Sequence, residues 1–219
     1  MLRDKRYGSK GFRALPVALM LVFGANYSTE ALPPPNKISF QLFPNPQLNV
    51  IPCLRASAGV VPSVLVTVER QKFNDQMTLT LKNFKPGLAF DLFTVENSPL
   101  RSNGTRDPLF KNFGLAWYQS DIETGTAATT VTIKTVLLDE IFGFDPKVNL
   151  PPTNTFHVGF WFDKPKDAAA CGFAGPPTPF NPIHKAGPNA FISKPRGVAG
   201  LGPLCTNPDN STTPPTCKL

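Results

Sequence analysis

Helical patterning is almost missing from this sequence. Only two short stretches, at 136–142 and 167–171, have the composition of a helical turn. No other segment has the three-to-four-residue apolar spacing of an amphipathic helix. The shortage of helix leaves an all-β fold as the expected class.

The motifs of several enzyme classes are missing as well. There is no G-x-S-x-G nucleophile elbow and no glycine-rich phosphate loop. The chain has only two histidines, His157 and His184, and neither belongs to an H-x-H or H-E-x-x-H pair. The sequence therefore does not favour an enzyme.

Two kinds of partner are also disfavoured. The net charge is +7, but the basic residues are scattered and form no cluster of the kind that follows a phosphate backbone, so we expect no nucleic-acid partner. Only one long apolar run occurs, at 15–25, and none follows it. We therefore expect no stable membrane span once that run has been removed.

The apolar run itself has the features of an export signal. Lysines and arginines precede it, and a short polar segment leads from it to Ala31. The run is shorter than the roughly 20 residues that a membrane span needs. We expect residues 1–31 to be a signal peptide, cleaved after Ala31 or alternatively after Ala25, which makes the protein secreted, extracellular or periplasmic. No cysteine lies just after the run to receive a lipid anchor.

Four cysteines remain after cleavage: Cys53, Cys171, Cys205 and Cys217. An even number in an exported chain predicts two disulfides, and three pairings are possible. We expect Cys205–Cys217 to close a proline-rich terminal loop and Cys53–Cys171 to tie an early strand to a late loop. A thiolate metal site is disfavoured because there is no C-x-x-C pair.

Apolar and polar residues alternate with a period of two from residue 38 to residue 162, which indicates strands with one buried face. The clearest runs are at 64–69, 77–82, 88–93, 131–135 and 156–162. Lys85, Pro86 and Gly87 lie between two of these runs and predict a hairpin. We expect an antiparallel β-sandwich, jelly-roll or immunoglobulin-like, rather than a barrel.

This domain is expected to span residues 38–195. An extended, proline-rich leader at 32–37 precedes it, and a proline-rich tail at 196–219 follows it. The late part of the domain contains several phenylalanines and isoleucines, so we expect it to pack across the strands as a long loop region rather than to be a free tail.

The two histidines suggest one candidate site. His157 shares a strand face with Trp161, and Gly159 between them leaves room for a ligand or for another backbone. If the loop that contains His184 folded back over this face, two imidazoles and a carboxylate, Asp121 or Asp163, would meet. Such a set could bind a divalent metal or transfer protons. Structural hydrogen bonding of the histidines is the favoured alternative.

Aromatic side chains suggest a second candidate. Trp117, Tyr118 and Trp161 lie on strands that look central, and aromatic platforms stack on sugars in β-rich binding proteins. Packing in the core is the favoured alternative here too.

Four segments occur in a recognisable order: FGLAWYQSD at 113–121, FHVGFWFD at 156–163, DAA at 167–169 and FNPIHKAG at 180–187. Together they resemble a group of exported, β-rich bacterial proteins of unknown function, over roughly residues 75–195. The resemblance implies a product of the bacterial cell envelope or the extracellular space. It implies no activity and no site residues.

The sequence thus predicts a secreted, disulfide-stabilised β-sandwich that acts as a binding or structural surface module without a cofactor. Its partner would be a glycan, a protein at the cell surface or a second copy of the chain. The alternative is a metal-dependent extracellular hydrolase or lyase that uses His157 and His184.

Overall fold

The computed structural model describes residues 37–71, 75–125, 130–136, 155–175, 186–197 and 200–205. All of them belong to the second of the chain's two compact units, Ala31–Leu219. The predicted signal peptide, the leader at 32–36, His184 and Cys217 lie outside the described residues.

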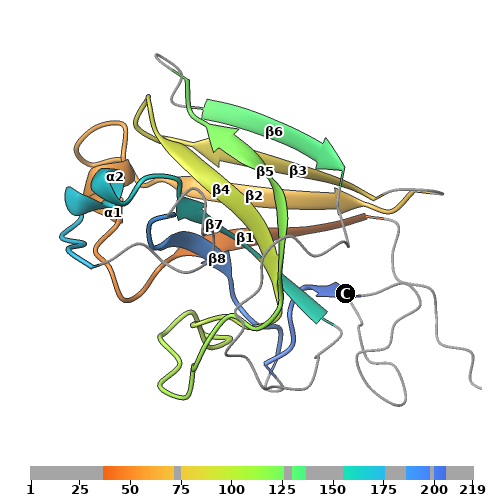
Figure 1. Ribbon diagram of the computed structural model, residues 1–219. Coiled ribbons are helices and arrows are strands. Elements are labelled where there is room, and N and C mark those ends of the chain that lie inside the picture. The colour runs from red at the N-terminus through yellow and green to blue at the C-terminus, as the bar shows by residue number, and fades with distance from the viewer. Residues whose placement is uncertain are drawn as a thin grey trace, which may run out of the picture. The chain divides into compact units, whose positions relative to one another are not determined.

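Nearly all of the regular structure is β-strand (Figure 1). The nine described strands are β1 (Lys37–Pro44), β2 (Ser63–Glu69), β3 (Gln76–Lys82), β4 (Ala89–Val95), β5 (Ala116–Glu123), β6 (Thr130–Val136), β7 (Thr155–Phe162), β8 (Asn189–Ser193) and β9 (Leu204–Cys205). The two described helices are short, α1 (Ile51–Leu54) and α2 (Pro165–Ala169). The prediction of an all-β fold with very little helix is confirmed.

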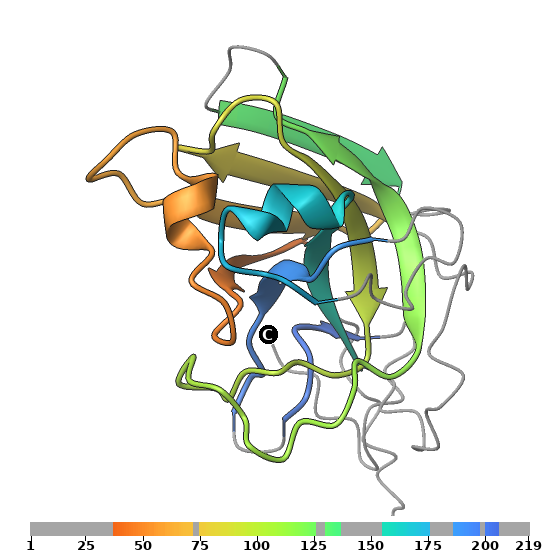
Figure 2. The ribbon, with the colours of Figure 1, turned by 60° about the vertical axis from the view of Figure 1, so that its left-hand side comes forward.

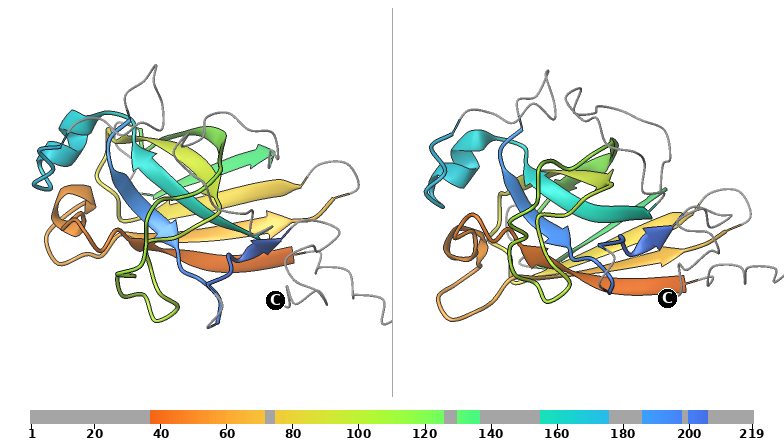
Figure 3. Two further views of the ribbon diagram at one scale, coloured as in Figure 1. Left: turned by 60° about the horizontal axis from the view of Figure 1, so that its bottom comes forward. Right: turned by 90° about the horizontal axis from the view of Figure 1, so that it is seen from below.

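The strands form one antiparallel sheet with the order β5-β4-β7-β8-β1-β2-β3-β6, and β9 pairs with the beginning of β7. The sheet curls so strongly that its two end strands, β5 and β6, come close together (Figures 2 and 3). The expected two-sheet sandwich is not confirmed, because hydrogen bonds continue from β7 through β8 to β1 without a break.

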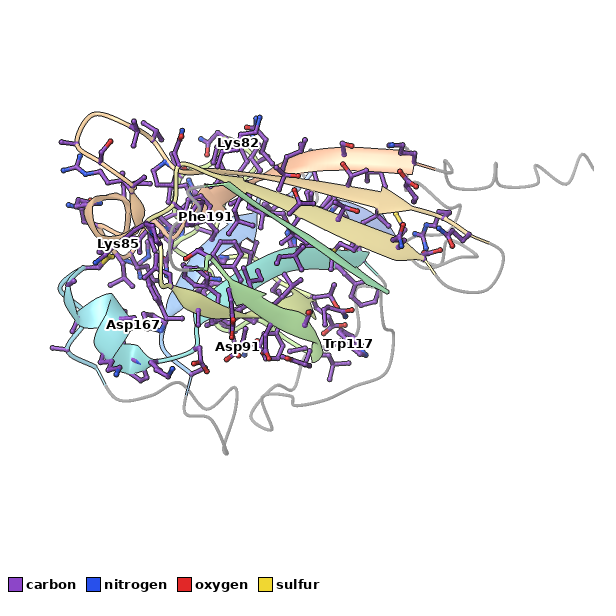
Figure 4. The ribbon with its side chains drawn as sticks, turned by 90° about the horizontal axis from the view of Figure 1, so that it is seen from above. Lys82, Lys85, Asp91, Trp117, Asp167 and Phe191 are labelled. Atoms are coloured by element: carbon purple, nitrogen blue, oxygen red, sulfur yellow. A yellow bond between two sulfur atoms is a disulfide. The ribbon has the colours of Figure 1, made fainter. Side chains whose placement is uncertain are left out.

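The interior of the curled sheet is the main core. Val64, Val66 and Val68 of β2 alternate with outward residues, as the period of two predicts, and at most 1% of each valine is exposed. Figure 4 shows Phe191 of β8 in the interior, between the strands of the two sides. Every residue of β8 is buried, and β4 and β7 are also buried on nearly their whole length. These three strands therefore pack on both faces.

The expected hairpin at Lys85, Pro86 and Gly87 is wrong. These residues do turn the chain from β3 to β4, but β3 pairs with β2 and β6, whereas β4 pairs with β5 and β7. The connection crosses an end of the curled sheet instead. It inserts Phe84 into the core, where its ring contacts three other phenylalanine rings.

A disulfide at the two helices joins early and late parts of the chain. Cys53 of α1 is bonded to Cys171, just after α2, with a Cα–Cα distance of 5.4 Å. This is the expected pairing. Cys205 is also in a disulfide, and its expected partner, Cys217, lies outside the described residues. Disulfides of this kind are typical of proteins from oxidising compartments.

The second predicted helical turn corresponds to α2, which begins and ends two residues earlier than expected. The first, at 136–142, lies almost wholly outside the described residues. Among the described helices, none is long and apolar enough to cross a membrane.

We predict that the double substitution Cys53→Ala/Cys171→Ala lowers the free energy of unfolding by about 4 kcal/mol, because the disulfide closes a long loop in the unfolded chain. Its sequence separation is 118 residues. Urea unfolding of both proteins without reductant measures the difference. A reductant should then destabilise the wild type much more than the variant. An unchanged urea midpoint would show that the disulfide is not a major constraint on the unfolded chain.

Candidate functional site

A β-bulge in β5 determines which side chains share the outer face of the sheet. Leu92 of β4 lies opposite Ser120, but the next residue, Phe93, lies opposite Tyr118, so Gln119 is the extra residue. An extra residue reverses the alternation of the strand beyond it. Tyr118 and Asp121 are three positions apart and would point to opposite faces of a regular strand. The bulge places them on the same face.

Gln119 itself holds the bulge in place. Its side chain is buried, and its Nε2 donates a hydrogen bond of 2.9 Å to Oγ1 of Thr94 on the neighbouring strand. Moving this buried amide away from its partner would cost free energy, because the amide would remain out of water without a hydrogen bond.

Two carboxylates and a tryptophan lie in one row across three neighbouring strands, on the same face as Tyr118. Asp91 of β4 is directly opposite Asp121 on β5 and directly opposite Trp161 on β7. Asp163 follows Trp161 by two residues, just beyond the end of β7. We call the set Asp91, Tyr118, Asp121, Trp161 and Asp163 the acidic–aromatic face.

The members of the acidic–aromatic face differ in depth. Trp161 has no exposed surface and Asp91 is buried, so these two form the floor. Tyr118 is half-buried and Asp121 is exposed. Asp163 is partly exposed, and its Oδ2 is 3.4 Å from Nζ of Lys164. A ligand in solution would therefore meet one phenol and two carboxylates.

Aromatic packing supports this face from below. The Phe93 ring makes edge-to-face contacts with the rings of Tyr118 and Trp161, with centroids 5.6 and 5.5 Å apart. Phe113, from the connection between β4 and β5, also makes an edge-to-face contact with the Trp161 ring, with centroids 4.9 Å apart. The Tyr118 ring is thus held in place by contacts with other aromatic side chains.

The electrostatics of the face keep Tyr118 neutral. Burial raises the pKa of its phenol well above the ordinary value of 10.0, and its hydrogen bond to Asp121 and the negative charges of Asp121, Asp91 and Asp163 raise it further. The hydroxyl donates to Oδ1 of Asp121 at 2.6 Å. Tyr118 is therefore a hydrogen-bond donor and not a base near neutral pH.

His157 lies elsewhere on the same side of the sheet. It is opposite Val95, four residues along β4 from Asp91, which corresponds to roughly 13 Å at the usual rise of a strand. The histidine is fully buried. The structure thus brings Tyr118, Trp161, Asp121 and Asp163 together but leaves His157 apart from them.

The imidazole of His157 is engaged with the end of β8. Its Nδ1 is 3.1 Å from the carbonyl oxygen and 3.0 Å from Oγ of Ser193. Among the described residues, none forms a hydrogen bond with Nε2. The backbone of Gly200 is close to the ring, and its effect is to raise the pKa of His157. Burial is the stronger effect and lowers the pKa of His157 to about 4. The ring is therefore neutral at physiological pH.

The remaining sequence-predicted residues have other positions. Trp117 is buried on the opposite face from Tyr118, and its ring packs edge-to-face on Phe156 (Figure 4 shows its place on β5). The two tryptophans and Tyr118 therefore do not make one exposed platform. The space expected beside Gly159 is filled by the backbone of β8. A Cβ at Gly159 would be only 3.0 Å from the carbonyl oxygen of Phe191.

Among the residues that the structure describes, no group of three or more His, Cys, Asp and Glu side chains is arranged to hold a metal ion. His184, which the metal-site hypothesis requires, is not one of those residues.

No family model, curated protein or solved structure matches this chain. The resemblance to exported bacterial proteins therefore stays a prediction.

We predict that His157 makes the protein less stable in mild acid. The unfolded histidine takes up a proton near pH 6.5, but the folded one does so only near pH 4, so the unfolded state binds more protons between these values. The free energy of unfolding should fall by about 3 kcal/mol from this group as the pH drops through that window.

The measurement compares urea unfolding of the wild type and of His157→Gln at a series of pH values. The variant should be less stable at pH 7.5, and its disadvantage should shrink between pH 6.5 and pH 4 because glutamine does not titrate. All other ionisable groups are common to both proteins. A constant difference across the window would contradict the prediction.

Proposed function

We propose that this protein is an exported binding module, and that the acidic–aromatic face is its ligand surface. The observation that carries the proposal is the bulge at Gln119, which brings the Tyr118 hydroxyl to 2.6 Å from Asp121 on one face of a rigid sheet. The predicted signal peptide and the disulfide between Cys53 and Cys171 support a place outside the cytoplasm.

The chemistry of this face suits a glycan. Exposed carboxylates accept hydrogen bonds from paired sugar hydroxyls, and such charge-assisted bonds are about twice as strong as neutral ones. A half-buried phenol ring offers an apolar edge to a sugar ring. The groups are held by a buried floor, so little side-chain freedom is lost on binding.

The charge of the face narrows the class of glycan. Asp91, Asp121 and Asp163 repel uronic acids and sulfated sugars, whereas an amino sugar with a free ammonium group would be attracted. We therefore expect neutral or basic oligosaccharides to bind in preference to acidic ones.

The test is a printed array of neutral, basic and acidic oligosaccharides, followed by calorimetry with the best binder. Tyr118→Ala and Asp121→Asn should each weaken its affinity about 10-fold or more, because each removes a directed contact. Tyr118→Phe, which keeps the ring and loses the hydrogen bond to Asp121, should have a smaller effect than Tyr118→Ala.

Glu69→Gln is the matched control. It removes one exposed carboxylate from the outward side of β2, where Glu69 pairs with Lys37 at 2.8 Å, and should leave the affinity unchanged. Absence of binding across the array, or equal losses in the control and in Asp121→Asn, would refute the assignment of this face.

A further inference from the structure

The connection between β4 and β5, residues 96–115, is a long loop that projects from the sheet (Figure 1). Its two ends are joined by backbone hydrogen bonds, from Glu96 N to Leu115 O at 3.1 Å and from Asn97 N to Phe113 O at 2.9 Å. The loop therefore has a closed neck, and its central part extends away from the strands. We refer to residues 96–115 as the basic loop.

The basic loop has a fixed conformation. Side-chain oxygens of three residues accept hydrogen bonds from backbone N–H groups two positions ahead, in turns at Asn103, Asp107 and Asn112. Near the neck, the ring of Phe110 packs on that of Phe113, with centroids 5.0 Å apart. Phe113 in turn contacts the buried Trp161, so aromatic packing connects the loop to the core.

The part of the basic loop that returns toward the neck exposes an apolar side chain. Leu109 is 80% exposed, more than any other large hydrophobic residue among those described. Its backbone N–H is bonded to Oδ1 of Asp107 at 3.0 Å, which fixes its position. The neighbouring Pro108 is also exposed. A rigid segment thus holds an apolar group in water, where it contributes nothing to the fold.

The loop also has three basic residues, two of which, Arg106 and Lys111, are within three positions of Leu109 in the sequence. Arg101, Arg106 and Lys111 are exposed. The loop has two acidic residues: Glu96 is buried at the neck, and Asp107 lies 3.8 Å from the guanidinium of Arg101. The exposed part of the loop is therefore positively charged around Leu109.

We propose that the basic loop docks on an anionic lipid surface. Leu109 enters the boundary between headgroups and acyl chains, and Arg106 and Lys111 contact the phosphate groups. An apolar side chain gains free energy when it leaves water for this boundary, and basic residues gain from the negative surface potential. A soluble polyanion would satisfy only the charges and would leave Leu109 in water. A lipid surface offers both an apolar region for Leu109 and negative charges for the basic residues, so it fits better than a soluble polyanion.

This inference goes beyond the proposed function and does not depend on it. The loop and the acidic–aromatic face have no exposed residue in common. Substitutions at Leu109, Arg106 and Lys111 should accordingly leave any glycan affinity unchanged.

The test is co-sedimentation of the purified protein with vesicles of phosphatidylcholine and phosphatidylglycerol, compared with vesicles of phosphatidylcholine alone. We expect binding to the mixed vesicles only. Arg106→Gln and Lys111→Gln should each lower the partition coefficient about 5-fold. Leu109→Ser should lower it about 10-fold.

Two control variants come from the same chain. Val61→Ser removes another exposed apolar residue, 65% accessible, and Lys82→Gln removes an exposed positive charge from β3. Neither should change the partition coefficient. In Leu109→Trp, the emission of the new tryptophan should shift to the blue when mixed vesicles are added, because the residue enters an apolar environment.

Three outcomes would overturn the proposal. The first is no binding to mixed vesicles. The second is binding that Leu109→Ser leaves unchanged while dextran sulfate competes fully, which would indicate a site for soluble polyanions. The third is an equal loss in the control variants, which would indicate general adhesion of a basic protein.

Discussion

The sheet is continuous because of one short strand. β8 has five residues, and it is hydrogen-bonded to β7 on one side and to β1 on the other. Without it, the strand order would separate into β5-β4-β7 and β1-β2-β3-β6. Each part would then expose the apolar side chains that now face each other in the interior. The packing of Phe191 of β8 against Phe160 and Phe84 depends on the same junction.

Burial on both faces of β4 and β7 determines where a site can form. Their inner face belongs to the main core, and a second cluster, which includes Phe93, Val95 and Trp161, covers their outer face. On β5, at the side of this cluster, Tyr118 is half-buried and Asp121 is exposed, so both reach solvent. The same packing removes His157 from solvent and lowers its pKa. The candidate site is therefore located at the border between covered and uncovered sheet.

Local patterns predicted the strands well, because alternation directly reflects one buried and one wet face. Val64 to Val68 and Met77 to Leu81 are examples, and the pairing of Cys53 with Cys171 was also expected. It was harder to predict from the sequence which distant strands pair with each other. Lys85, Pro86 and Gly87 correctly indicate a turn, but the two strands on either side of it pair with other strands, β2 and β6 for β3, and β5 and β7 for β4. Tyr118, Trp161, Asp121 and Asp163 were each named as candidates, but in two separate hypotheses, and their place on one face with Asp91 was missed. No glycine or other local signal marks the bulge at Gln119, yet this bulge places Tyr118 on the same face as Asp121.

The late position of β8 also affects how the chain can fold. β1 is formed near residue 40, but its neighbour across the junction is not available until residue 193 has been synthesised. Contacts of such large sequence separation make folding slow. The two halves of the sheet therefore cannot be joined before residue 193 is available. For a chain with the export signal that the sequence predicts, this delay would keep the protein unfolded enough to be threaded through a translocation pore.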